Sequence, residues 1–220
     1  MVCVMDWVAW HRAYEDPSSS LSARLRSVRY HLSRALDRAP AGAVSVVSLC
    51  AGQGRDVIGV LPGHPRRDDV RGVLIEADET NAGLARRAAA DAGLAQVDVR
   101  QADASLVTSF ADALPADVLL LCGIFGNVSE RDIRRTVEAA PTLCRPGATV
   151  IWTRHRRSPD VTPRVRGWFA AAGFEEIAFD ALATDALTGV GVNRLRRAAP
   201  AAMPDGPLFT FGTDDPGRRR

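Results

Sequence analysis

The sequence predicts an α/β fold built on a mostly parallel sheet with helices on both faces. Three observations predict it. Short β-rich runs alternate with helical runs between residues 44 and 172, a glycine-rich turn follows the first run, and two strand-like runs lie close together near the C-terminus. Alternation of this kind favours parallel strands because each return to the sheet needs a crossover. A length of 220 residues with 46% hydrophobic composition fits one domain.

The first predicted element is an amphipathic helix over residues 21–38. The residues Asp16-Pro17-Ser18 supply start signals, and Pro40 and Gly42 follow its end. Its apolar residues recur at helical spacing, at Leu21, Leu25, Val28, Leu32 and Leu36. This apolar stripe predicts that one side of the helix packs on the body of the domain.

The alternation that follows predicts the rest of the sheet. We expect strands near 44–49, 72–76, 96–100, 117–122 and 147–153, and helices near 54–61, 79–92, 130–140 and 160–172. The runs Phe174–Phe179 and Val190–Leu195 have no long helix between them, which predicts an antiparallel pair. Residues 198–220 form an extension with a candidate edge strand at 208–211 and a disordered end.

Composition narrows the function classes. The formal charge of +2 gives no electrostatic footprint for nucleic acid or an anionic membrane, and no apolar run is long enough to span a bilayer. The N-terminus lacks the apolar core of a signal peptide. No C-x-x-C pair occurs among the widely spaced cysteines Cys3, Cys50, Cys122 and Cys144, so no metal site is predicted. We expect a cytoplasmic protein without membrane or nucleic-acid partners.

The turn "SLCAGQGRDVIG" raises the question of what binds beside it. A parallel strand that ends in a glycine-rich turn and opens a helix places backbone N–H groups at the carboxyl edge of the sheet. The glycines allow a ligand to approach the main chain. The dinucleotide fingerprint needs a small residue three positions after Gly54, and Val57 stands there, which counts against NAD. A plain tight turn is the structural alternative.

Two carboxylates at later strand ends refine this interpretation. Glu76 follows Gly54 by 22 residues, where an acid can accept hydrogen bonds from both ribose hydroxyls. Asp78 is the rival for that role if the strand ends later. Asp103 ends a third strand and can meet a purine edge, or it can cap the next helix. Together the turn and the two acids predict an adenosine pocket without a diphosphate.

Here the chain resembles the class I S-adenosylmethionine-dependent methyltransferases, over roughly residues 44 to 196. Its Trp-His-x-x-Tyr segment also resembles that of a bacterial, actinobacterial subgroup of that family. The resemblance implies a Rossmann-like seven-stranded sheet with an antiparallel C-terminal hairpin. It divides the chain into an N-terminal helical cap or lid (1–40), a methyltransferase domain (41–197) and the extension.

The resemblance also implies S-adenosylmethionine as cofactor and a set of residues that bind it. The family turn reads acid-x-Gly-x-Gly-x-Gly, and this chain departs from it with Ser48 at the acid and Cys50 at the first glycine. These departures leave the usual contact to the cofactor's amino group unassigned. The cofactor-binding residues so implied are Cys50, Ala51, Gly52, Gln53, Gly54, Glu76, Ala77, Asp78, Asp103, Ala104, Cys122, Gly123 and Ile124.

An aromatic stripe near the N-terminus is the first candidate for the acceptor side. Trp7, Trp10, His11 and Tyr14 share one side of a helix at i, i+3, i+4 and i+7. Either this side packs the helix on the domain, or it forms a lid over the cofactor with His11 or Tyr14 facing the methyl group. In the second interpretation Trp7 and Trp10 contact the substrate, and a histidine near neutral pKa takes a proton from the acceptor.

The ends of two later strands supply further acceptor-side candidates. His155 lies at the end of the fifth strand, in "RHRRSPD", and is the third catalytic candidate. Arg156 in the same run either binds an acidic substrate or belongs to a solvated loop. Phe125, in "CGIFGN" after the fourth strand, is a further substrate candidate. Because this loop lacks the Asn/Asp-Pro-Pro-aromatic pattern that holds a flipped base, a small-molecule acceptor is favoured.

The predicted function is therefore methyl transfer to a small molecule by in-line displacement, in a monomer or a homodimer. Two alternatives remain. A methyltransferase-like protein that binds the cofactor without catalysis is suggested by Ser48 and Cys50. An NAD-linked oxidoreductase is the weaker alternative, because the chain has no lysine for a Tyr-x-x-x-Lys dyad.

Overall fold

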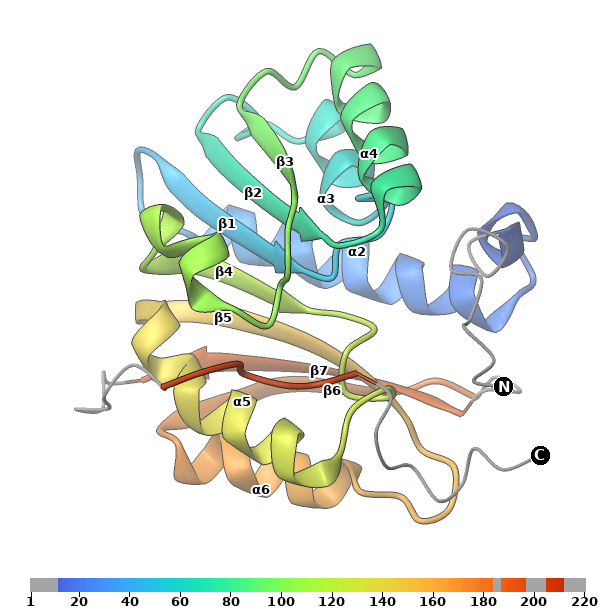
Figure 1. The fold of residues 1–220 in the computed structure, drawn as a ribbon, viewed down its shortest axis with the longest axis vertical. Coiled ribbons are helices and arrows are strands. Elements are labelled where there is room, and N and C mark those ends of the chain that lie inside the picture. The colour runs from blue at the N-terminus through green and yellow to red at the C-terminus, as the bar shows by residue number, and fades with distance from the viewer. Residues whose placement is uncertain (1–11, 184–186, 197–204, 212–220) are drawn as a thin grey trace.

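A computed structural model describes residues 12–183, 187–196 and 205–211 of the chain. A seven-stranded sheet in the order β3-β2-β1-β4-β5-β7-β6 forms its centre (Figure 1). The strands are β1 (Val44–Leu49), β2 (Val70–Glu76), β3 (Val97–Gln101), β4 (Ala116–Leu121), β5 (Cys144–His155), β6 (Phe174–Ala181) and β7 (Thr188–Leu195). Strands β1 to β5 pair in parallel, and β7 runs antiparallel to both β5 and β6. The predicted mostly parallel sheet with an antiparallel C-terminal hairpin is confirmed.

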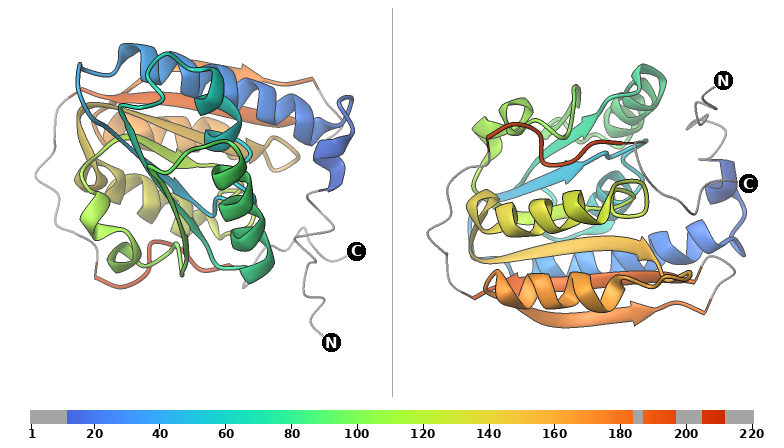
Figure 2. Two further views of the ribbon diagram at one scale, coloured as in Figure 1. Left: turned by 90° about the horizontal axis from the view of Figure 1, so that it is seen from above. Right: turned by 60° about the horizontal axis from the view of Figure 1, so that its bottom comes forward.

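Helices cover both faces of this sheet (Figure 2). Three helices, α2 (Ser20–Arg38), α3 (Val57–Val60) and α4 (Glu79–Asp91), share one hydrophobic core with one face of the sheet. On the other face, α5 (Glu130–Leu143) and α6 (Thr162–Ala171) pack over a second core. The alternation of strands and helices predicted two covered faces, and the central strand β4, "ADVLLL", is accordingly apolar on both sides.

Helix α2 forms where its apolar stripe predicted it. Ser19 caps its start, since the side chain accepts a hydrogen bond from the N–H of Ser22. Val28, Leu32 and Leu36 are buried against the sheet. At the C-terminal end of α2 the guanidinium of Arg66 donates to four main-chain carbonyl groups, those of Leu36, Ala39, Pro40 and Gly42. Only Leu36 of these four lies within α2, so the contacts tie the end of the helix to the loop that leads to β1.

The helix predicted at 54–61 is shorter than expected. Only Val57–Val60 are α-helical, and a 3-10 turn, η2 (Leu61–Gly63), follows. Pro62 removes a backbone N–H and Gly63 weakens helix propagation, which explains the early end. A single turn carries little macrodipole, so this helix does not supply the anion-binding N-terminus that the glycine turn suggested. Any charge recognition at this edge therefore depends on side chains.

The edge strand predicted at 208–211 is not formed. Residues 205–211 instead cross the second face of the sheet, and only Phe211 makes an isolated antiparallel bridge, to Val128. The backbone N–H of Leu208 donates to the carbonyl of Ser105 at 2.8 Å, and Thr136 of α5 donates to the carbonyl of Leu208 at 3.1 Å. Because a loop and a helix take up these groups, the segment has no strand partner to extend the sheet.

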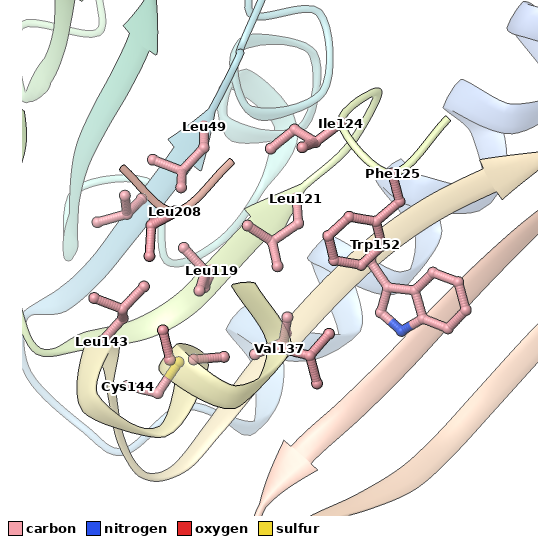
Figure 3. Close-up of a cluster of buried hydrophobic side chains, with 14 of the residues drawn as sticks. Leu49, Leu119, Leu121, Ile124, Phe125, Val137, Leu143, Cys144, Trp152 and Leu208 are labelled. Atoms are coloured by element: carbon pink, nitrogen blue, oxygen red, sulfur yellow. The ribbon is translucent and has the colours of Figure 1, made fainter. Parts of the chain in front are cut away.

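Leu208 holds this segment in place. Its side chain is fully buried in the second core, and Figure 3 shows it beside Leu49 of β1 and Leu119 of β4. Between β3 and β4 this face carries only two short 3-10 turns, η3 (Val107–Ser109) and η4 (Ala111–Ala113). The C-terminal segment therefore covers strand surface that no long helix covers there.

The boundaries proposed for three regions are not tested by the fold. Helix α2 packs directly on the sheet, in one layer with α3 and α4, and η1 (Arg12–Glu15) precedes it. Residues 1–11 of the proposed cap lie outside the described part, as do residues 212–220 of the extension. Within the described ranges, no helix combines the length and the apolar character needed to cross a bilayer.

Candidate functional site

A cavity of about 320 Å³ opens at the carboxyl edge of the sheet. The sheet order reverses between β1 and β4, since β2 and β3 continue on one side and β5 to β7 on the other. Ligands of open α/β sheets bind in the crevice at such a reversal. The cavity is lined by Cys50, Ala51, Gly52, Gln53, Glu76, Ala77, Asp78, Asp103, Ala104, Cys122 and Gly123, all of them predicted cofactor-binding residues.

The backbone of the glycine turn is left-handed at three positions. The φ angles of Cys50, Gly52 and Gly54 are 54°, 57° and 66°. Cys50 thus adopts a conformation that favours glycine, so the turn keeps its form although the residue has a Cβ. Gly54 is the one turn residue of the predicted set that does not line the cavity. It packs inward instead, and its role is to let the turn approach the core.

We expect the substitution Gly54→Ala to lower the free energy of unfolding by about 2–3 kcal/mol. A methyl group there would lie 2.6 Å from Cδ1 of Ile58 and 2.8 Å from Cδ2 of Leu74, in addition to the strain of a positive φ. Urea unfolding of the two proteins measures the difference. Gly63→Ala is the matched control, because a Cβ there meets open space, and it is expected to change stability by no more than about 1 kcal/mol. Equal effects of the two substitutions would contradict this account of the turn.

Glu76 is fixed at the end of β2 by two backbone donors. The N–H of Gly52 donates to Oε2 at 2.7 Å and the N–H of Asp78 donates to Oε1 at 2.9 Å. Burial raises the pKa of Glu76, and these hydrogen bonds oppose the rise. Asp78, the rival acid, is the N-cap of α4, and its Oδ1 accepts the hydrogen bond of the Asn81 N–H. The carboxylate of Glu76 therefore faces the cavity with its position already set.

Asp103 does not take the helix-capping role that the sequence left open, because the N-cap of the next 3-10 turn, η3, is Leu106. Asp103 lines the cavity, and its Oδ1 accepts the N–H of Ser105 at 2.8 Å in a tight turn after β3. The nearby Cys50 is half-buried, and desolvation of its thiol raises the pKa, with Glu76 and Asp103 adding to the rise. Burial also raises the pKa of Cys122 across the cavity. Both cysteines are therefore protonated thiols rather than nucleophilic thiolates at neutral pH.

Some residues of the loop after β4 line the cavity, and others lie in the hydrophobic core. Cys122 and Gly123 line the cavity, and the N–H of Gly123 donates to Oγ1 of Thr153 at 2.9 Å. Ile124 and Phe125, however, are fully buried and belong to the second core. The structure thus places neither the predicted cofactor contact at Ile124 nor the predicted substrate contact at Phe125 on the cavity wall. Each turns inward because the loop folds back toward β5, where Phe125 packs on Trp152 (Figure 3).

Among the described acceptor-side candidates, Tyr14 lines the cavity, whereas His155, Arg156 and Phe125 do not. Tyr14 lies in η1. His155 and Arg156 lie at the carboxyl end of β5, and the Arg156 N–H donates to the carbonyl of Leu187 at 2.7 Å. Trp7, Trp10 and His11 lie outside the described residues.

Sequence reasoning missed several residues that the cavity wall contains. Some come from the ends of the described chain: Arg24 and Leu25 of α2, and Phe209 and Phe211 of the C-terminal segment. Others lie near predicted site residues: Arg55, Asp56, Asn81 and Asn127. The motif "GQGRD" could have indicated Arg55 and Asp56, which directly follow the turn. Nothing in the local pattern of "LFTF" indicates a position beside β3 and β4, because only the tertiary fold puts it there.

Comparisons with known proteins give the fold a name. Neither protein-family models nor curated proteins match the chain. Among solved structures, an O-methyltransferase family protein from Burkholderia thailandensis aligns with a TM-score of 0.65 and 18% identity, covering 89% of this chain and 60% of that one. An O-methyltransferase family 2 protein from Planctomyces limnophilus, in complex with apigenin, aligns with a TM-score of 0.56 and 18% identity, covering 80% and 59%.

The chain has the class I methyltransferase fold. It spans about 60% of the length of the first of these proteins, so the likeness concerns one fold unit of a longer chain. The class I methyltransferase fold does not by itself fix the chemistry. SpnF, described as a [4+2]-cyclase, aligns with a TM-score of 0.53 and 16% identity, covering 74% of this chain and 80% of its own. Function has to be argued from the residues of the cavity.

Proposed function

We propose that this protein binds S-adenosylmethionine in the cavity and transfers its methyl group to a small-molecule acceptor. The observation that carries the proposal is the carboxylate of Glu76, half-buried at the end of β2 and held against the glycine turn by the Gly52 N–H. A carboxylate so placed accepts the two hydroxyl groups of a ribose. Asp103 and Ala104, at the end of the next strand, extend the wall to where a purine would lie.

The cavity fits such a ligand in its polar groups as well as its size. Asn81 is only 1% exposed and lines the cavity, and its Nδ2 has no hydrogen-bond partner among the described residues. A buried amide donor without a partner is costly, so a ligand oxygen near Glu76 would satisfy it. A volume of about 320 Å³ lies at the lower end of the range for small-molecule sites. Phe209 and Phe211 add aromatic surface suited to an adenine ring.

The side chains of this cavity favour direct transfer to the acceptor. When bound, S-adenosylmethionine supplies a methyl group on a positively charged sulfur. Cys50 and Cys122 stay protonated because burial raises the pKa of each thiol, so neither would carry the methyl group covalently. Burial likewise raises the pKa of Tyr14, so its hydroxyl would donate a hydrogen bond at neutral pH rather than remove a proton. The chain thus supplies alignment and exclusion of water.

The residues proposed to contact the acceptor are chosen by their position in the fold. Tyr14 is the candidate that lies on the cavity wall, and we retain His11 and His155 as residues that would take the proton of a hydroxyl or amine acceptor. The other candidates could contact the acceptor only if it extended beyond this cavity. They are Trp7, Trp10, Phe125 and Arg156.

Calorimetric titration with S-adenosylhomocysteine and NAD⁺ tests the proposal. We expect one equivalent of S-adenosylhomocysteine to bind, with no heat from NAD⁺, because the cavity has acids for a ribose but no third small residue after Gly54 for a diphosphate. Saturation at about 100 times the Kd is expected to stabilise the fold by about 2.7 kcal/mol in a thermal scan. Binding of NAD⁺ in place of S-adenosylhomocysteine would contradict the proposal.

Cofactor binding without catalysis is the second candidate function. It is favoured by Ser48, which is buried and uncharged where the family has an acid, and by the likeness of the fold to a cyclase. Release of S-adenosylhomocysteine from S-adenosylmethionine, measured over a panel of phenols, carboxylates and amines, distinguishes the two. Tight binding with no turnover over that panel supports the second candidate.

We place the protein in the cytoplasm, as a monomer or homodimer that acts on small molecules and not on nucleic acid. Cys50, Cys122 and Cys144 are free thiols, in keeping with a reducing compartment. Burial raises the pKa of Cys144 to about 12, and this thiol is thereby protected from oxidation.

A further inference from the structure

The C-terminal segment, residues 205–211, joins two loops at the cavity. The N–H of Leu208 donates to the carbonyl of Ser105 at 2.8 Å, in the turn after β3. Phe211 forms an isolated antiparallel bridge with Val128, in the loop between β4 and α5. In the sheet, β2 and β1 separate β3 from β4, so the segment connects loops that belong to distant strands.

Both ends of this connection reach residues that line the cavity. The N–H of Ser105 donates to Oδ1 of Asp103, and Asp103 is part of the cavity wall. Phe209 and Phe211 of the segment also line the cavity, and their rings meet edge to face with centroids 5.5 Å apart. The position of the C-terminal segment therefore determines part of the shape of the cavity.

Helix α5 holds the segment by three side chains on one face. These side chains are Asp132, Arg135 and Thr136. The first accepts the N–H of Thr210 at 3.3 Å, the second donates to the carbonyl of Asp205, and the third donates to the carbonyl of Leu208 at 3.1 Å. All three contact the segment, and none of them is among the residues that line the cavity. They can therefore affect a ligand only through the segment.

The C-terminal segment is held less firmly than the sheet that it crosses. Of its seven residues, Leu208 and Phe209 are buried and the other five are exposed. Its main chain belongs to no strand, and the hydrogen bond of the Thr210 N–H is long. Segments with few buried side chains and few main-chain hydrogen bonds open locally while the rest of the fold stays intact. Opening of this segment would take Phe209 and Phe211 out of the cavity wall.

We propose that the C-terminal segment is a clasp whose docking on α5 and the binding of an adenosine ligand stabilise each other. Arg135 and Thr136 are positioning residues in this scheme, because they act on the cavity by keeping the segment docked. The inference rests on the proposed function, since the ligand is S-adenosylmethionine or its product. A ligand that binds only the docked form shifts the segment toward that form, and docking raises the affinity for the ligand in return.

Hydrogen exchange of single amides, followed by NMR on the full chain, tests the clasp. The reporters are the N–H groups of Leu208 and Thr210, which hold the segment to its neighbours. If only the docked segment binds ligand, S-adenosylhomocysteine at about 100 times its Kd is expected to slow exchange of both reporters about 100-fold.

The reference amide is that of Arg67. It donates to the carbonyl of His64 at 3.0 Å, in the turn before β2 and thus at the amino edge of the sheet, opposite the cavity. Local opening of this turn does not involve the cavity wall. We expect the ligand to change exchange of the Arg67 amide by less than about 2-fold.

Variants of α5 assign the docking contacts. Thr136→Val keeps the shape of a buried side chain and removes the donor to Leu208, so the Leu208 amide is expected to exchange about 3- to 10-fold faster without ligand. Arg135→Gln is expected to act in the same direction and provides the test if the buried variant fails to fold. Arg134→Gln is the matched control, because Arg134 is exposed on α5 and pairs with Glu138 at 2.8 Å.

The outcomes separate the clasp from the proposed function. Calorimetric binding of S-adenosylhomocysteine without slower exchange at Leu208 would overturn the clasp and leave the proposed function standing. Equal slowing at Leu208 and Arg67 would also overturn it, because the ligand would then act on the fold as a whole. Absence of binding would remove the proposed function and the clasp together.

Discussion

Replacing Glu76 with glutamine is expected to weaken S-adenosylhomocysteine and 5′-methylthioadenosine alike, by about 10- to 100-fold. Both ligands contain the ribose that this carboxylate would bind, and hydrogen bonds to a charged acceptor are stronger than those to a neutral amide. The amide would also set an N–H group against one of the backbone donors of Gly52 or Asp78. Calorimetry with the two ligands measures the loss, and unfolding in urea shows whether the turn survives.

The control for this variant is Asp78→Asn. Asparagine also caps helices well, so α4 keeps its start, and the variant tests whether Asp78 holds the ribose instead. We expect affinity to change by less than about 3-fold in this control. A large loss with Asp78→Asn and none with Glu76→Gln would reverse the assignment of the two acids.

The pH dependence of binding gives an independent check on Glu76. Burial raises its pKa, and Asp78 adds to the rise while hydrogen bonds from the main chain oppose it. Only the ionised carboxylate accepts both ribose hydroxyl groups, so the affinity for 5′-methylthioadenosine is expected to be constant above this pKa and to fall as the pH is lowered through it. In Glu76→Gln that part of the pH dependence should disappear.

The second large effect is expected at Leu208. The change Leu208→Ala should lower the free energy of unfolding by about 2–5 kcal/mol, because a fully buried side chain leaves a gap between the sheet and the C-terminal segment. Loosening of this segment should also weaken ligand binding, since Phe209 and Phe211 line the cavity. Urea unfolding and calorimetry measure the two losses.

Phe211→Ala is the comparison that separates packing from ligand contact. Phe211 is 43% exposed and lines the cavity, so its loss should cost no more than about 1 kcal/mol of stability while it weakens adenosine ligands by about 3- to 10-fold. Full stability of Leu208→Ala would show that the segment is not part of the folded core. Unchanged affinity of Phe211→Ala would show that the ring does not touch the ligand.

The sequence predicted most of the sheet because its signals are local. Apolar runs such as "VSVVSL" at Val44–Leu49 and the regular spacing of helices between them determine a parallel sheet through the crossover rule. The exceptions follow from context. The helix after the turn stops early at Pro62-Gly63, and "LFTF" has strand-like composition but finds its partners in a loop and in α5.

The candidate site was predictable where strand ends define it. Glu76 and Asp103 end neighbouring parallel strands, so their side chains must reach the same edge of the sheet. Arg24 and Phe211 could not be predicted this way, because their place in the cavity depends on how the two ends of the chain pack. The burial of Phe125 could not be predicted either, because it depends on the packing of its ring against Trp152.

The cavity wall joins Tyr14, near the start of the described chain, to Phe211, near its end. Translation proceeds from the N-terminus, and a nascent chain folds in that order. The sheet order up to β5 can be completed while the last residues are still inside the ribosome, but the wall of the cavity cannot. Ligand binding should therefore begin only after residue 211 has emerged, so a nascent chain arrested before that point should not be retained on immobilised S-adenosylhomocysteine.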